Sequence, residues 1–228
     1  MQTESVIVIP WRPPLDNNAT GHRAVNFAYV RDHYLSLGFR VIVASDGGEP
    51  GEPFNRSRAY NRGLVEACRR LAFRPDVVIW NEADCIIPEA QLNSGVRVAR
   101  DRPGLVVPYT ERIELTLDAT QRFRQQGMPF PVESKDIENL FTNGTSIGQC
   151  GITSAETLSM LGGWDEGFEG WGYDDNAMFH TFATKCGPPR WIMGPSLHLW
   201  HPLVMTTQSA DGQAVTERNR VRYEQMLS

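Results

Sequence analysis

Two carboxylates and two late histidines are the residues of this sequence best suited to binding a metal. Glu82 and Asp84 follow the apolar run 77–80 directly, and strand alternation would place both side chains on one side. Carboxylate oxygens at such a turn suit a divalent cation that also holds phosphates. An imidazole from His198 or His201 would favour manganese over magnesium. The spacing predicts a metal site, although an acidic loop without a ligand also fits it.

A second pair of carboxylates, Asp174 and Asp175, stands at an expected helix start. Carboxylates in a first helical turn complement the helix dipole, so the pair fits either a structural or a catalytic role. Trp171 precedes the pair between Gly170 and Gly172, where it has little local scaffolding for a core position. Its ring therefore fits a sugar-stacking role as well as a core role.

Polar residues also follow the two earlier apolar runs. Pro10, Trp11 and Arg12 come after the first run, and Asp46 comes after the second. Ligands of an open parallel sheet bind at the carboxyl ends of its strands. These residues are therefore candidates for the same site, while an exposed arginine and a turn aspartate are the plainer alternatives.

Short apolar runs alternate with helical patterns along the chain, which predicts an α/β fold with a mainly parallel sheet flanked by helices. The expected strands are 6–9, 41–44, 77–80, 105–107 and 197–199. The expected helices lie around 27–37, 60–71, 89–100 and 117–126, after a capping box at Thr153 and Glu156, from Asp174, and at 211–228 with Thr216 as a cap. With no linker or repeat, 1–228 is expected to be a single domain.

Two stretches stand apart from this alternation. The segment 109–144 is polar and contains two prolines, and we interpret it as an excursion from the sheet on the acceptor side. The segment 141–152, which contains three glycines, is expected to be partly mobile without donor and to close over it.

Composition sets broad limits on the class of protein. The 228 residues carry 22 Lys and Arg against 27 Asp and Glu, a net charge of −5, and are 41% hydrophobic. This excludes a disordered or collagen-like chain and gives no global attraction to nucleic acids or anionic membranes. No apolar run approaches a membrane span and no signal-peptide pattern occurs, so we expect a cytoplasmic protein. The four cysteines form no CxxC pair, which argues against a zinc ribbon.

The motifs, taken in order, resemble those of GT-A fold glycosyltransferases, most closely the β-1,4-galactosyltransferase group with its N-acetylgalactosaminyltransferase relatives. Residues 9–12, I-P-W-R, resemble that group's I-P-F-R, and 54–63 resemble its F-N-R-A-K-x-x-N-x-G. Residues 82–84 stand where the group has D-x-D, and 162–165 with 170–176 resemble its G-G-x-x and G-W-G-G-E-D-D.

The resemblance implies a role for each matching residue. The nucleotide and donor would lie against Pro10, Trp11, Arg12, Asp46, Phe54, Arg56 and Glu82, with Asp46 at the uracil. Asp84 and His201 would bind the metal; His201 is preferred over His198 because it fits the group's late histidine and because strand residues three apart face opposite sides. Trp171 would lie beside the sugar and acceptor, Asp174 would hold a hydroxyl, and Asp175 would be the catalytic base.

Two departures from the group's pattern bear on specificity. Glu82 replaces the first aspartate of D-x-D, so it would meet either the ribose or the metal, and Tyr173 replaces a glycine beside the donor sugar, which questions a galactose preference. The animal enzymes of the group also carry a membrane anchor. Because no anchor is recognised here, a bacterial or phage-like setting is expected.

These expectations combine into a metal-dependent inverting glycosyltransferase that uses Mn²⁺ or Mg²⁺ and a UDP-sugar carrying a hexose or N-acetylhexosamine. The acceptor hydroxyl is open among saccharide, protein and modified nucleobase, so a nucleic acid would enter only as acceptor. A retaining enzyme is the weaker mechanistic alternative. A sugar-nucleotide nucleotidyltransferase would need a glycine-rich phosphate loop with a basic residue, which residues 10–14 do not provide. A non-catalytic carbohydrate-binding relative would lose the metal residues.

Overall fold

A computed structural model of the chain describes residues 5–13, 17–49, 51–71, 74–142, 147–202 and 210–228. Its larger sheet has six strands in the order β2-β1-β3-β8-β5-β9. The strands are β1 (Ser5–Pro10), β2 (Arg40–Ala44), β3 (Val77–Asn81), β5 (Val106–Val107), β8 (Cys150–Ser154) and β9 (Arg190–Trp191). Three of the pairings between these strands are parallel, and the two made by β8 are antiparallel. The predicted α/β class with a flanked, mainly parallel sheet is therefore confirmed for this sheet.

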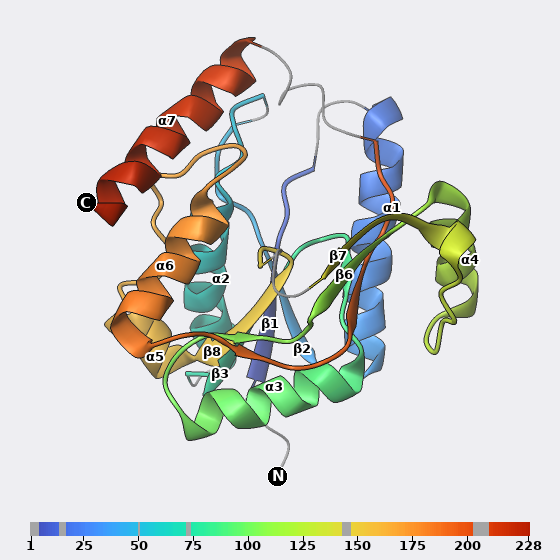
Figure 1. Cartoon of the computed structure of the whole chain (residues 1–228), viewed down its shortest axis with the longest axis horizontal. Coiled ribbons are helices and arrows are strands. Elements are labelled where there is room, and N and C mark those ends of the chain that lie inside the picture. The colour runs from blue at the N-terminus through green and yellow to red at the C-terminus, as the bar shows by residue number, and fades with distance from the viewer. Residues whose placement is uncertain (1–4, 14–16, 50, 72–73, 143–146, 203–209) are drawn as a thin grey trace.

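The central strands form the core because their apolar runs are buried along their whole length. All residues of β1 and β3 are buried, as expected for strands covered on both faces. Figure 1 shows α1 (Asn17–Ser36) on one side of the sheet and α2 (Arg56–Leu71) on the other. At Gly63 a Cβ atom would lie 2.2 Å from Val8 Cγ1, so only glycine allows α2 to approach β1 this closely.

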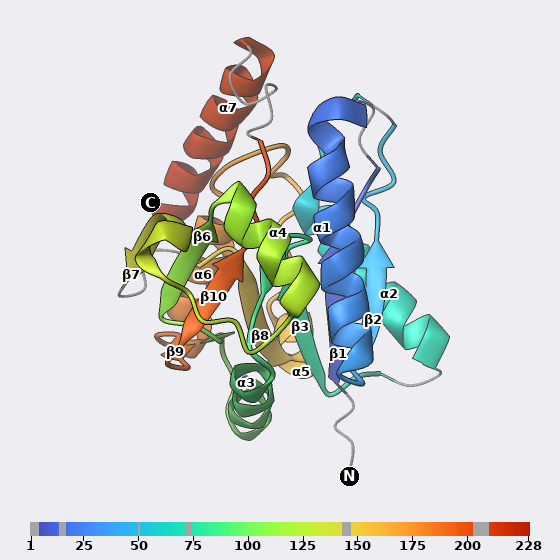
Figure 2. The same ribbon diagram turned by 90° about the vertical axis from the view of Figure 1, so that its right-hand side faces the viewer.

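The remaining α-helices lie around the larger sheet. They are α3 (Glu89–Asp101), α4 (Leu117–Gln126), α5 (Ala155–Met160), α6 (Asp174–Cys186) and α7 (Ala210–Leu227). Figure 2 shows α1 and α4 side by side, where the rings of Tyr29 and Phe123 lie 5.5 Å apart. None of the helices in the described ranges is both long and apolar enough to cross a bilayer.

A second sheet of four strands corrects the interpretation of 109–144 as a loop excursion. Its order is β4-β10-β6-β7, formed by β4 (Cys85–Ile86), β10 (Pro195–His198), β6 (Glu111–Leu115) and β7 (Ile137–Thr142). Within β6, Ile113 and Leu115 are buried while their neighbours are not, which is the alternation of a strand with one covered face. The segment is polar because one face of β6 is not buried and β7 is exposed along nearly its whole length, not because the segment is irregular.

Two predicted helix caps are also corrected. Thr153 belongs to β8, and the next residue, Ser154, caps α5 by accepting a hydrogen bond from the Thr157 backbone N–H at 3.1 Å. Thr216 does not cap the last helix, because α7 already begins at Ala210. Residues 143–146 lie outside the described residues, so the expected mobility of 141–152 stays a prediction.

Candidate active site

Three groups of side chains gather where β1, β2 and β3 end, at one edge of the larger sheet. These strands run parallel, so their carboxyl ends share that edge, where open α/β sheets bind ligands. We call the groups the nucleotide corner (Arg12, Asp46 and Phe54, named after the role that the sequence predicts for them), the histidine cluster (Asp84, His198 and His201) and the Arg56 cluster (Arg56, Glu82, Asp174 and Asp175).

The nucleotide corner joins residues that the sequence placed after separate strands. Asp46 is buried, and its Oδ2 accepts hydrogen bonds from Arg12 Nη1 at 3.2 Å and from the Asn55 backbone N–H at 3.0 Å. The Arg12 guanidinium carbon lies 5.5 Å from the centre of the Phe54 ring. A buried carboxylate, a cation and an aromatic ring thus stand together at the start of α2.

The other two residues predicted for the nucleotide lie at the edge of this corner. Pro10 is the buried last residue of β1. The Trp11 ring stacks on Phe27 of α1, with centroids 4.3 Å apart and planes 6° from parallel. Trp11 therefore packs against a helix and does not join the polar contacts of Arg12 and Asp46.

The histidine cluster gathers three possible metal ligands. His201 Nε2 lies 3.1 Å from Asp84 Oδ2, and His198 Nε2 lies 3.6 Å from Asp84 Oδ1. One ligand atom from each residue lies within 4.8 Å of the others. The expectation that the two histidines face opposite sides is wrong, because both lie near Asp84. β10 ends at His198, and the chain turns as the Leu199 N–H bonds to the Asp84 carbonyl at 2.8 Å, so strand alternation does not extend to His201.

The protonation of this cluster suits a divalent cation. Burial alone would raise the pKa of Asp84, but His198, His201 and Arg23 hold it well below its ordinary value, so the carboxylate is ionised. Burial lowers the pKa of His198 despite Asp84. Burial also acts to lower the pKa of His201, but the hydrogen bond and the charge of Asp84 together outweigh it and raise that pKa. Metal binding needs an ionised carboxylate and neutral imidazoles, so a cation would release a proton from His201. Two nitrogens and one oxygen leave positions open for other oxygen ligands.

The Arg56 cluster was not predicted as a unit. Arg56 donates from Nε to Asp174 Oδ2 at 2.8 Å, from Nη2 to Asp175 Oδ2 at 2.5 Å, and from Nη1 to Glu82. One expectation is corrected here. Glu82 and Asp84 do not share a side, because β3 ends at Asn81 and the turn sends Glu82 to Arg56 and Asp84 to the histidines. Asp174 and Asp175, which are adjacent in α6, both reach the same guanidinium.

One guanidinium faces three carboxylates in this cluster, and burial raises the pKa of two of them, Glu82 and Asp175. Burial raises the pKa of Asp175 to about 6; Asp174 adds to the increase, while Arg56 opposes it. Burial likewise raises the pKa of Glu82 to about 7, with Arg56 opposing and Asp84 and Asp175 adding to the increase. Within the described part of the chain, Asp175 Oδ1 is buried and has no hydrogen-bond partner. Asp175 therefore has both the basicity and the free oxygen to accept a proton.

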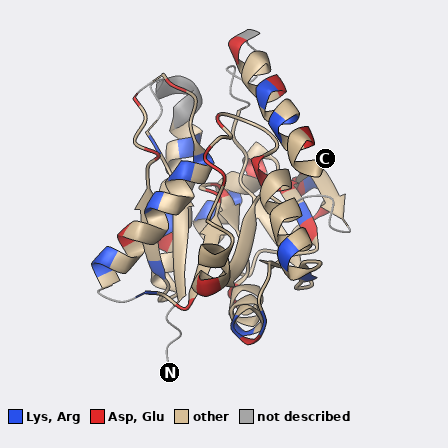
Figure 3. Cartoon of the chain, turned by 90° about the vertical axis from the view of Figure 1, so that its left-hand side faces the viewer, with Lys and Arg blue, Asp and Glu red and all other residues tan. Residues whose placement is uncertain are grey.

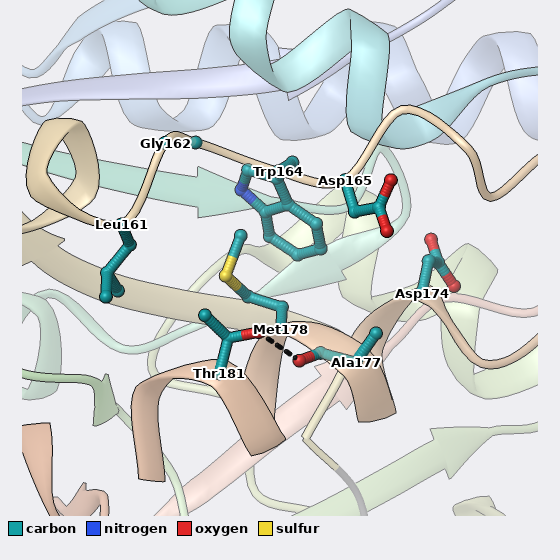
Figure 4. Close-up of a pocket in the computed structure, with 9 residues that line it drawn as sticks. Leu161, Gly162, Trp164, Asp165, Asp174, Ala177, Met178 and Thr181 are labelled. Carbon is teal, nitrogen blue, oxygen red and sulfur yellow. Dashed lines mark hydrogen bonds between the residues drawn. The ribbon is translucent and has the colours of Figure 1, made fainter. Parts of the chain in front are cut away.

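The glycine-rich loop before α6, residues 162–173, contains both buried and exposed aromatic residues. Trp164 and Phe168 are buried, whereas Trp171 is 67% exposed. Behind Asp174 lies a cavity of about 230 Å³ (Figure 4). It is lined by Leu161, Gly162, Gly163, Trp164, Asp165, Asp174, Ala177, Met178 and Thr181. Trp171 is therefore the member of this aromatic set that a ligand can reach.

Sequence reasoning overlooked several neighbours of these groups. Arg23 of α1 comes within 3.8 Å of Asp84, and Tyr60 of α2 adjoins Arg56, with Glu82 and Asp175 helping burial to raise the pKa of its phenol. A Cβ at Gly148 would lie 2.2 Å from Asp175 Oδ2, so the backbone there touches the carboxylate. Tyr60 could have been found from its place one helical turn after Arg56, whereas Arg23 carried no local signal and Gly148 was noted only as one of the three glycines of 141–152.

Comparison with known proteins identifies the fold. No family model and no curated protein matches the sequence. Among solved structures, GalNAc-T7 with UDP, GalNAc and Mn²⁺ is similar at a TM-score of 0.50 and 14% identity, over 96% of this chain and 47% of that one. Glucosyl-3-phosphoglycerate synthase from Mycobacterium tuberculosis gives 0.49 and 12% over 97% and 80%. Drosophila β1,4-galactosyltransferase 7 gives 0.47 and 12% over 83% and 63%.

These likenesses bear on the fold alone. The chain has the GT-A fold that its motifs predicted. It spans less than two thirds of the length of the Drosophila enzyme and about half that of GalNAc-T7.

Proposed function

We propose that this protein is a metal-dependent glycosyltransferase that moves a hexose or N-acetylhexosamine from a UDP-sugar to an acceptor hydroxyl with inversion. One observation carries the proposal: the histidine cluster, whose residues could bind a metal ion, and Asp175 both lie beside the nucleotide corner at one sheet edge. Asp175 has a raised pKa and an oxygen, Oδ1, with no hydrogen-bond partner among the described residues. GalNAc-T7, which shares the fold, holds UDP, GalNAc and Mn²⁺.

The proposal gives the nucleotide corner and the histidine cluster separate tasks. Asp46 would accept from the uracil and the Phe54 ring would pack against the nucleoside, with Arg12 holding both residues in place. Asp84, His198 and His201 would hold Mn²⁺ or Mg²⁺. The cation would neutralise the charge that develops on the leaving UDP.

Asp175 would act as the base. Its Oδ1 would take the proton of the acceptor hydroxyl while that oxygen attacks the anomeric carbon from the face opposite UDP. Arg56 fixes the other oxygen of Asp175, so the unpartnered oxygen keeps one direction. Asp174 would hold a hydroxyl group, and the exposed Trp171 would pack against the sugar or acceptor.

The raised pKa of Asp175 predicts an acid limb in the rate of transfer. Below about pH 6 the carboxylate is protonated and cannot accept the proton, so kcat should fall about tenfold per pH unit as the pH drops further. The measurement is kcat between pH 4.5 and 8 with saturating donor and Mn²⁺. A kcat that stays constant down to pH 4.5 would contradict the assignment of Asp175 as the base.

Proteins of two other classes would give different experimental results. A sugar-nucleotide nucleotidyltransferase would release diphosphate from UTP and a sugar phosphate. A non-catalytic carbohydrate-binding relative would bind without turnover, but it would have no reason to keep Asp84 beside two histidines and Asp175 beside Arg56.

A screen of UDP-sugars with Mn²⁺ tests the proposal directly, because slow donor hydrolysis needs no known acceptor. We expect UDP release from one or a few donors and its loss on adding EDTA. The anomer first released, followed by NMR, should be inverted relative to the donor; a retained anomer would favour the retaining alternative. No UDP release from any donor, together with diphosphate release from UTP and a sugar phosphate, would favour the nucleotidyltransferase.

A further inference from the structure

The C-terminal helix α7 lies against the glycine-rich loop that leads into α6 (Figure 1). Its exposed face is ordinary: acidic and basic residues are interspersed along it (Figure 3), and Arg220 pairs with Glu217 and Glu224 of the same helix. Its covered face is unusual because side chains on this face form hydrogen bonds with backbone atoms of the loop. The sequence predicted the helix but gave it no role.

Asn219 makes most of these contacts and is buried. Its Nδ2 lies 2.8 Å from the Glu169 carbonyl, 3.0 Å from that of Gly172 and 3.3 Å from that of Trp171. Its Oδ1 accepts from the Glu169 N–H at 3.4 Å. Because carbonyls only accept, the amide must present its nitrogen to all three, and its two hydrogens are shared among them.

Other α7 side chains support the same loop. Thr216 Oγ1 donates to the Trp171 carbonyl at 3.3 Å, and Arg222 makes two bonds of 2.9 and 2.8 Å to the carboxylate of Asp165. The Tyr223 ring lies 5.8 Å from that of Tyr173. The loop is therefore held at its start, middle and end by one helix.

The loop needs such support because one of its residues, Tyr173, has a strained backbone conformation, whereas the glycines adopt positive φ without strain. Gly170, Gly172 and Tyr173 have φ values of 65°, 99° and 69°. Tyr173 is the non-glycine residue with positive φ among those the structure describes, and an L-residue is strained there. Asp174 and Asp175 follow directly, so the direction in which α6 starts depends on this turn.

We propose that Asn219 is a positioning residue for Asp174 and Asp175, and that α7 thereby belongs to the scaffold of the active site. The inference rests on the proposed function for its catalytic consequence. Asn219 is too far along the chain from the pair to be found by any local motif, and it acts through the carbonyls of residues 169, 171 and 172.

The test uses Asn219→Asp and Asn219→Ala, with Arg220→Ala as the matched control on the same helix. Asn219→Asp keeps the shape but removes both donors and turns a carboxylate toward three carbonyl oxygens. We expect kcat for transfer, or for donor hydrolysis where no acceptor is known, to fall by about 10- to 100-fold, the scale of a misplacement near 1 Å. The affinity and stoichiometry of UDP binding with Mn²⁺ should stay within about twofold, because the nucleotide corner is untouched. Arg220→Ala should change neither.

Hydrogen exchange of residues 165–176 gives a readout that does not depend on activity. Exchange should accelerate in both Asn219 variants and not in Arg220→Ala. Unchanged exchange, or normal kcat in both variants, would overturn the inference, as would a loss of kcat matched by an equal loss of UDP-binding sites, which would mean simple misfolding. If the wild-type protein transfers nothing while exchange still accelerates in the variants, the positioning role stands and the proposed function fails.

Discussion

Asp84→Ala is expected to abolish the manganese-dependent part of UDP binding. Asp84 is the only carboxylate of the histidine cluster, and both imidazoles point at its oxygens. Without it, two neutral nitrogens would remain to hold a dication beside Arg23. Loss of residues that merely orient a ligand costs about 10- to 100-fold in metal affinity, and loss of the charged ligand itself should cost more. Calorimetry of UDP with Mn²⁺, and again with EDTA, measures the effect.

The structure places two histidines beside Asp84, whereas the sequence favoured His201 as the metal ligand. His198→Ala and His201→Ala should both weaken metal-linked UDP binding, whereas His180→Ala, on the outer part of α6, should not. Normal binding in His198→Ala with loss in His201→Ala would restore the single-histidine site. Donor turnover that is unchanged by EDTA would show that the cluster is not a required metal site.

The fold could be predicted where burial is uniform. β1 and β3 are apolar at almost every position because both faces are covered, so the run of residue types alone identifies them. β6 and β7 could not be identified in this way. β7 is exposed at nearly every position, and β6 pairs with β10, which lies far along the sequence. Their pairing depends on contacts between segments that are distant in the sequence, and the residue types of a polar segment with prolines do not indicate those contacts.

The residues of the site could be predicted better than their partners. Each of Arg12, Asp46, Asp84, His201 and Asp175 was predicted as a site residue from its place after a strand or from the resemblance, and the structure places all five in the three groups described above. The alternation rule failed for Glu82 and His198, because both lie where a strand stops and the chain turns. Arg56 was assigned to the nucleotide, but its guanidinium binds carboxylates 26, 118 and 119 positions away. No local pattern can show that three acidic segments meet at one cation.

Asp175→Asn should lower the rate of sugar transfer by about 10²–10⁴-fold, the usual contribution of a general base. The amide keeps the shape and an oxygen that can still accept from Arg56, but it cannot take the acceptor proton. UDP affinity with Mn²⁺ should barely change, because neither the nucleotide corner nor the histidine cluster contacts this residue. The measurement is kcat for transfer, or donor hydrolysis where no acceptor is known, alongside calorimetry with UDP.

Asp174→Asn is the matched comparison, because the two residues share a guanidinium and differ in one respect. Asp174 Oδ2 accepts a hydrogen bond from Arg56 Nε and lies 2.7 Å from Nη2 in an ion pair, whereas Asp175 has a buried oxygen with no partner in the described ranges. A free oxygen on a carboxylate of raised pKa is what a base requires, so Asp174→Asn should weaken acceptor binding more than it lowers kcat. If Asp174→Asn is inactive and Asp175→Asn transfers normally, the base is the other carboxylate. If both transfer normally, neither residue activates the acceptor, and an inverting mechanism through this cluster fails even though the metal and nucleotide sites could still be correct.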